Sequence, residues 1–194
     1  VPRAVASGGG VWVTAGEGLL RSPDGWTWQQ VDDRSFQDVA WDGRRFVAVG
    51  FGGVFASPDG AAWSELGGPR WGGCVAARGG SLLTAGGWPE FHGRTYPGEV
   101  ATSADGLLWS EASASPRVVL DATWAEGLWV AVGWHGLLGT SSDGFAWRWH
   151  GQQARERAFY DAAGSSGTTV AVGGQTGPYT YLQDLLWSAA GVGW

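Results

Sequence analysis

Lysine, isoleucine, asparagine and methionine do not occur in this chain of 194 residues, and cysteine occurs only once. Because codons for the four missing residues are rich in A and T, their absence indicates a GC-rich genome or a deliberately restricted design alphabet. The single cysteine, Cys74, excludes an internal disulfide, and we expect it to pack in an innermost strand. A chain that starts at Val1 and lacks methionine is expected to be a processed product or a fragment.

Basic residues and long apolar runs are also scarce. The chain has 12 basic and 18 acidic residues, which gives a net charge of −6 and a pI near 4.9. This acidic balance disfavours nucleic acid as a partner. No apolar run is long enough to span a bilayer, and no segment has a sustained helical period. The chain is instead rich in glycine, with 35 residues, and in tryptophan, with 15, which argues against long helices.

One heptapeptide recurs along the chain. "SPDGWTW" at 22–28 returns as "SPDGAAW" at 57–63, "SADGLLW" at 103–109 and "SSDGFAW" at 141–147, and "YLQDLLW" at 181–187 is an eroded copy. A second block, typified by "VAVG", ends at a glycine in each copy, and these anchor glycines are Gly16, Gly50, Gly86, Gly133 and Gly173. Their spacing of 34 to 47 residues is typical of a repeat architecture.

Each repeat holds four short strand-like stretches that are separated by glycine-bearing turns. In the second repeat they are 38–41, 45–49, 54–57 and 62–66. Four strands per repeat predict an all-β fold, a β-propeller of five four-stranded antiparallel blades, formed by 1–33, 34–68, 69–114, 115–152 and 153–194 within a single domain, 1–194. The last repeat ends with its own last strand, 186–190, so no strand is left over to complete the first blade and close the ring. The alternative is therefore that the chain forms part of a larger or oligomeric propeller.

The heptapeptide has a structural explanation. Serine and aspartate can accept hydrogen bonds from turn amides, glycine can take the left-handed conformation, and tryptophan can pack back over the turn. We therefore expect these aspartate and tryptophan corners to be scaffold, with the corner tryptophans being Trp28, Trp63, Trp109, Trp147 and Trp187.

With these two blocks, the repeats resemble the Asp-box (BNR-type) propeller repeats of secreted bacterial proteins, such as sialidase-like and lectin-like propellers. The resemblance covers nearly the whole chain and rests on the pattern "VAVG" followed by "SxDGxxW". It implies the propeller fold and a secreted, periplasmic or cell-surface location. The spacing between aspartate and tryptophan is one residue shorter than in the sialidase form, and such repeats occur in enzymes, lectin-like binders and assembly factors alike, so the resemblance does not fix a function.

Function is expected where the repeats differ, in the loops between second and third strands. The third repeat carries an insertion there, "GWPEFHGRTYPG" at 87–98, and the fourth has Trp134 and His135 at the matching position. Aromatic rings beside polar groups suit sugar faces, whereas the alternative is that Trp88 and Phe91 only plug the loop onto the blade. The predicted ligand-binding residues are Trp88, Glu90, Phe91, His92, Arg94, Tyr96, Trp134 and His135.

Three aspartates share a position in the repeat. Asp38, Asp121 and Asp161 each lie twelve residues before an anchor glycine, at the expected start of an innermost strand. Carboxylates at a channel mouth could act as a glycosidase set, as in five-bladed hydrolases of the arabinanase kind, or could hold calcium. The alternative, which we favour, is that each aspartate accepts backbone amides from a neighbouring blade.

The sequence thus favours a non-catalytic extracytoplasmic binding module, with carbohydrate as the ligand and no cofactor. A glycoside hydrolase and a structural or protein-docking propeller in a surface assembly are the alternatives. The three histidines lack metal-ligand spacing, so no metal site is predicted from them. A glycan or a protein is the expected partner, and an oligomer is compatible with the unlatched edges.

Overall fold

All regular structure among the described residues is β-strand. The computed structural model describes residues 1–70, 72–87, 98–110, 113–125, 127–150, 157–165, 168–175 and 183–189, and it divides into two compact units, Val1–Thr84 with Thr102–Glu111 and Ala85–Ala101 with Ala112–Trp194. Across these ranges, no helix has the length and apolar character needed to cross a membrane.

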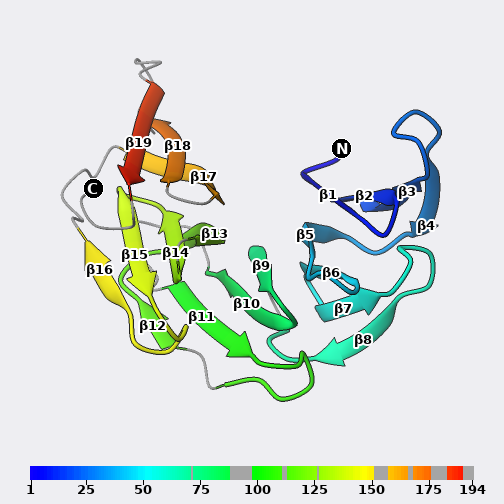
Figure 1. The fold of residues 1–194 in the computed structure, drawn as a ribbon, viewed down its shortest axis with the longest axis horizontal. Helices are drawn as coiled ribbons and strands as arrows, with labels where there is room; N and C mark the ends of the chain where they lie inside the picture. The colour runs from blue at the N-terminus through cyan, green and yellow to red at the C-terminus, as the bar shows by residue number, and fades with distance from the viewer. Residues whose placement is uncertain are drawn as a thin grey trace, which may run out of the picture. The chain divides into compact units, whose positions relative to one another are not determined.

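The strands form five sheets, each built from consecutive neighbours in the sequence (Figure 1). Sheet one contains β1 (Ala4–Gly8), β2 (Val11–Gly16), β3 (Gly18–Ser22) and β4 (Gln29–Asp32), and sheet two contains β5 (Phe36–Trp41), β6 (Phe46–Gly50), β7 (Gly53–Ser57) and β8 (Ser64–Gly67). Sheet three contains β9 (Cys74–Arg78), β10 (Ser81–Gly86), β11 (Gly98–Ser103) and β12 (Ser113–Ser115), and sheet four contains β13 (Val119–Ala125), β14 (Leu128–Gly133), β15 (Leu137–Ser141) and β16 (Arg148–His150). The predicted strands of the second repeat are thus confirmed to within two residues.

Sheet five differs from its predicted form. Its described strands are β17 (Arg157–Ser165), β18 (Thr168–Gln175) and β19 (Gln183–Ala189), and β19 pairs with β18 as the third strand. Trp187 lies opposite Val170 within this pair, so the predictions of a corner at Trp187 and of a last strand at 186–190 were wrong. The eroded heptapeptide has no Asp-Gly to turn the chain there, and the strand runs on through it.

The core lies between neighbouring sheets inside each compact unit. Phe46 and Phe36 are fully buried between sheets one and two, where Phe36 meets Phe55 edge to face with ring centroids 5.6 Å apart. In the second unit, a cluster of Val130, Val132, Leu138, Phe159, Ala162 and Ala171 joins sheets four and five. Strands that are apolar on both faces, such as "FVAVG" in β6, fit this arrangement because sheet two packs against sheet one on one side and against sheet three on the other.

The anchor glycines mark a close approach of backbone to backbone. A Cβ atom on Gly50 would lie 2.5 Å from the carbonyl oxygen of Ser35, and one on Gly16 would lie 2.5 Å from that of Val1. Gly133 and Gly173 meet the carbonyl oxygens of Val118 and Ala158 in the same way. In sheets two, four and five the contact lies beside an irregular register at the start of the first strand, so the repeated glycine accommodates this irregularity.

Four of the predicted corners are confirmed as hydrogen-bonded scaffold. In the first, the amides of Trp26 and Thr27 donate to Asp24 Oδ1 at 2.8 and 2.7 Å, and the Ser22 hydroxyl donates to the same oxygen. The tryptophan indole N–H closes each turn by donating to the carbonyl of the corner glycine, at 2.9 to 3.2 Å in Trp28, Trp63, Trp109 and Trp147. Glycine is required because its φ is near +80° at each corner, as at Gly106 and Gly144.

Because of the corner aspartates, we expect the folded protein to lose thermal stability in acid. Backbone amides of Thr27 and Trp26 lower the pKa of Asp24 from 3.8 to about 2, and equivalent amides lower the pKa of Asp59, Asp105 and Asp143. Because each pKa is lower in the folded chain, the contribution is present above pH ~4 and is lost as pH falls toward 2. Thermal unfolding followed from pH 5 to pH 2 should show a falling midpoint, and Asp143→Asn should make that fall shallower. An unchanged slope in this variant would contradict the assignment.

Candidate functional site at the loop end of the sheets

The turns between second and third strands gather at one end of each sheet, together with the linkers that lead to the next sheet. We call this the loop end. Six predicted ligand-binding residues belong to the inserted turn of sheet three, at 88–97, and lie outside the described residues: Trp88, Glu90, Phe91, His92, Arg94 and Tyr96.

The other two, Trp134 and His135, lie together in the turn between β14 and β15. Their rings are 6.2 Å apart, and His135 has a left-handed φ of 58°. The backbone amide of Trp134 donates to Val118 at 3.1 Å, and Trp134 forms an isolated bridge with Ala158. Both side chains are half-buried, so this turn joins sheets four and five as well as presenting rings at the loop end.

Asp38 and Asp121 form hydrogen bonds to the sheet that follows their own. The Val75 amide on β9 donates to Asp38 Oδ2 at 2.8 Å, and the Ala162 amide on β17 donates to Asp121 Oδ2 at 2.7 Å. These are the hydrogen bonds that the scaffold interpretation of the repeated aspartate expects. The third aspartate, Asp161, is exposed on β17.

Metal binding finds no support within the described ranges, where no group of three histidine, cysteine or acidic side chains is arranged to hold an ion. Cys74 is buried in β9, as expected for an innermost strand, and its backbone carbonyl accepts a hydrogen bond from the Thr84 hydroxyl at 3.0 Å.

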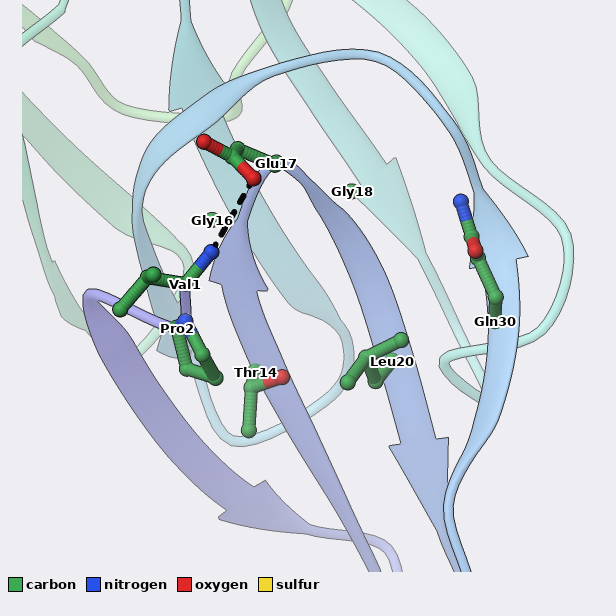
Figure 2. A pocket seen from close by; sticks show the side chains of 8 residues that line it. All are labelled: Val1, Pro2, Thr14, Gly16, Glu17, Gly18, Leu20 and Gln30. Carbon is green, nitrogen blue, oxygen red and sulfur yellow. Dashed lines mark hydrogen bonds and ion pairs between the residues drawn. The ribbon is translucent and has the colours of Figure 1, made fainter.

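A pocket that the sequence did not predict opens beside the short turn of sheet one (Figure 2). Thr14, Leu20 and Gln30 are cross-strand neighbours on β2, β3 and β4, and Val1 and Pro2 close the opposite side. The pocket holds about 210 Å³, and its lining consists of Val1, Pro2, Thr14, Gly16, Glu17, Gly18, Leu20 and Gln30.

Thr14 is the distinctive group in this pocket. It is only 8% exposed, and its hydroxyl, which points toward Leu20 in Figure 2, has no hydrogen-bond partner among the described residues. The Glu17 carboxylate accepts a hydrogen bond from the amino group of Val1 at 3.3 Å. The Gln30 side-chain amide donates a long hydrogen bond to the Asp32 carbonyl at 3.4 Å. The lining therefore offers an amide and a carboxylate around a small space, and the Thr14 hydroxyl is covered within its wall. A threonine inside an apolar strand was the only signal in the sequence.

The next loop-end turn and linker add an aromatic ring and a cation. Phe51, between β6 and β7, is 65% exposed. In the linker before sheet two, the Arg34 guanidinium lies 4.0 Å from the centroid of the Phe55 ring and pairs with Asp32 at 2.6 Å. Hydrogen bonding from Arg34 lowers the pKa of the Asp32 carboxyl, so this pair stays charged at neutral pH.

Known structures with a similar backbone are β-propeller proteins. An ancestral GH74 enzyme matches all of this chain with a TM-score of 0.72 at 17% identity, and a chain of the nidogen/laminin complex matches 91% with 0.62 at 14% identity. The chain is a β-propeller. The GH74 xyloglucanase from Xanthomonas campestris matches 94% of this propeller with a TM-score of 0.58 at 14% identity.

These similarities show the fold alone. The propeller covers 30% of the ancestral enzyme, 37% of the xyloglucanase and 76% of the chain from the nidogen complex. No protein-family model matches the chain, and no curated protein matches it. The propeller part of the predicted resemblance is thus confirmed, while the Asp-box family stays a prediction.

Proposed function

We propose that this propeller is a non-catalytic binding module for carbohydrate and that one sugar ring binds in the pocket beside the turn of sheet one. The observation that carries the proposal is the buried, unpaired hydroxyl of Thr14. A buried polar group without a partner costs about 1–3 kcal/mol, and because the Thr14 oxygen is covered in the empty pocket, a ligand hydroxyl recovers this cost by moving the cover aside. The pocket is smaller than the ~300–1,000 Å³ typical of drug-sized ligands, which suits a single ring.

The lining has the chemistry that sugar hydroxyls need. Thr14 can donate or accept, the Gln30 amide can do both, and the Glu17 carboxylate accepts. On the neighbouring sheet, the exposed ring of Phe51 offers a flat apolar surface on which a second sugar residue could stack. We also propose a secreted, periplasmic or cell-surface location, which the resemblance to the repeats of secreted propellers supports.

The hydrogen bonds of Asp38 and Asp121 favour a binding module over a glycoside hydrolase. Asp38 and Asp121 each accept a hydrogen bond from a backbone amide of the following sheet, at 2.7–2.8 Å. This structural role accounts for the repeated aspartate without a substrate. The proposal therefore assigns these side chains to the scaffold.

Glycan-array screening followed by calorimetry with the best oligosaccharide tests this function. Thr14→Val keeps the shape of the side chain and removes the hydroxyl, so we expect about tenfold weaker binding from the loss of one hydrogen bond. The same variant should unfold at a slightly higher temperature in the absence of glycan, because an unpaired buried hydroxyl is replaced by a methyl group.

Phe51→Ala provides the second variant, and Phe145→Ala provides its matched control. Phe145 is 56% exposed on the corner of sheet four, away from the loop end. We expect Phe51→Ala to weaken binding of a disaccharide more than that of a monosaccharide and Phe145→Ala to change neither. Absence of glycan binding, or equal affinity in the wild type and Thr14→Val, would rule out the pocket as a sugar site.

A further inference from the structure

Arginine occupies a fixed position of the repeat, sixteen residues before the anchor glycine. The second to fifth repeats carry it as Arg34, Arg70, Arg117 and Arg157. At this position the backbone contacts the turn of the preceding sheet, since the Arg70 carbonyl accepts the Gly52 amide and the Arg157 carbonyl accepts the Gly136 amide, both at 2.9 Å. The sheets differ, however, in the partner of the guanidinium.

The guanidinium of Arg34 has a carboxylate partner within the chain. Asp32, the last residue of β4, lies two residues before Arg34. Arg34 Nε donates to Asp32 Oδ1 at 3.0 Å, and Arg34 Nη2 donates to Asp32 Oδ2 at 2.6 Å. This parallel pair of hydrogen bonds is the arrangement in which arginine binds a carboxylate with two donors at once. An arginine at this position can therefore hold a carboxylate through Nε and Nη2.

Arg117 occupies the same position without a carboxylate. Ser115, the last residue of β12, lies two residues before it, and the Ser115 hydroxyl donates to the backbone carbonyl of Arg117 at 2.5 Å. Arg117 Nη1 donates to the Pro116 carbonyl at 2.8 Å. Arg117 Nε is buried without a hydrogen-bond partner, and none of the described acidic side chains forms an ion pair with Arg117. In this linker, the described residues therefore supply no carboxylate to the arginine.

We propose that Arg117 binds the carboxylate of an acidic sugar, a hexuronate, through the same Nε and Nη2 pair that Arg34 uses for Asp32. The inference rests on the proposed carbohydrate function and adds that this carbohydrate carries a carboxylate. A planar carboxylate matches the two parallel donors of a guanidinium, and the opposite charges strengthen both hydrogen bonds. Because Nε is covered, the ligand moves this cover aside and supplies the hydrogen bond that Nε lacks.

An aromatic ring in the same part of the loop end favours a sugar over a small anion. The Trp134 amide donates to the carbonyl of Val118, the residue after Arg117, at 3.1 Å. The Trp134 side chain is half-buried, so part of the indole remains accessible. Indole rings offer a flat apolar surface to the C–H groups of a sugar. The linker and turn of sheet four thus combine a cation for the carboxylate with a ring for the sugar.

Nitrogen-15 NMR of the arginine Nε–H groups measures binding at the proposed atom. Sodium glucuronate is the probe, and glucose at the same ionic strength is the neutral match. We expect glucuronate to shift the Nε–H resonance of Arg117 in a saturable way and glucose to leave it unchanged. Acetate should bind about fivefold more weakly than glucuronate, because it has a carboxylate but no ring to contact Trp134.

Two variants of Arg117 separate the donor pair from the charge. Arg117→Gln removes both and should weaken glucuronate binding by about tenfold or more, as measured by calorimetry. Arg117→Lys keeps the charge but has a single ammonium group, so it should also bind more weakly, and loss of its Nε–H resonance assigns that signal. Arg70→Gln is the matched control, because Arg70 has the same repeat position and is exposed to solvent. It should bind glucuronate like the wild type.

Three results would overturn the inference. They are an Arg117 Nε–H resonance that does not move up to about 50 mM glucuronate, full affinity in Arg117→Lys, and equal affinity for acetate and glucuronate. The first two would remove the carboxylate site, and the third would remove the sugar.

The pocket beside Thr14 belongs to the first compact unit and Arg117 to the second, so each site is tested by its own residues. Neutral glycan that binds in a Thr14-dependent manner, without any response of Arg117 to glucuronate, would retain the proposed function and reject this inference. Absence of binding to both kinds of sugar would reject both.

Discussion

Gly133→Ala is expected to lower the free energy of unfolding by about 3 kcal/mol. Gly133 ends β14, and an added methyl group would meet the carbonyl oxygen of Val118 and the backbone of Val119 at distances that van der Waals contact forbids. A flexible side chain could move aside, but this neighbour is the backbone at the irregular start of β13. Relief of the overlap would therefore require β13 and β14 to separate.

Urea unfolding followed by tryptophan fluorescence measures this loss. Gly10→Ala is the control, because Gly10 has a left-handed φ of 81° but no atom within 4 Å of an added Cβ. Only the conformational cost of about 1–2 kcal/mol applies there. If Gly133→Ala costs no more than Gly10→Ala, the close approach at the anchor glycine is not what requires glycine.

Phe46→Ala is expected to cost more still, about 3–5 kcal/mol. Phe46 is fully buried in the first compact unit, and its ring centroid lies 4.7 Å from that of Trp41. The corner of sheet two packs on the same ring, since a Cβ atom added at Gly60 would lie 3.5 Å from the nearest ring carbons of Phe46. Loss of the ring would leave a cavity bordered by strands that cannot close over it.

The same urea titration gives the size of this effect, with Phe145→Ala as the matched control. Phe145 is 56% exposed, and its truncation should change the free energy of unfolding by less than about 0.5 kcal/mol. A loss below about 2 kcal/mol for Phe46→Ala would mean that the first unit repacks around the missing ring.

The sequence predicted those features of the propeller that depend on local chemistry. Strand positions follow from apolar runs between glycine turns, and the corners at Asp24 and Asp143 follow from a serine, an aspartate and a glycine within four residues. The same reasoning failed at Trp187, because a tryptophan alone does not turn a chain. Where Asp-Gly is missing, the residues pair as a continuous strand instead.

The pocket could not be predicted in this way. It depends on the side-by-side register of Thr14, Leu20 and Gln30 in two consecutive hairpins and on the position of Pro2 beside them, and the pattern of apolar residues specifies neither. The role of Asp38 and Asp121 was one of three open interpretations, because spacing identifies a repeated carboxylate but does not identify its partner. The positions of the Val75 and Ala162 amides, which agree with the scaffold interpretation, become visible only in the folded chain.

The hydrogen bonds from Asp38 and Asp121 to the following sheet have a consequence for synthesis on the ribosome. Each of Asp38 and Asp121 precedes its amide partner, by 37 and 41 residues, so the earlier sheet can fold before the later one has emerged. At about 5–20 residues per second, an open sheet face then waits roughly 2–8 s for the strand that covers it. Sheets two and four can thus present their aspartates before the amides of sheets three and five are synthesised.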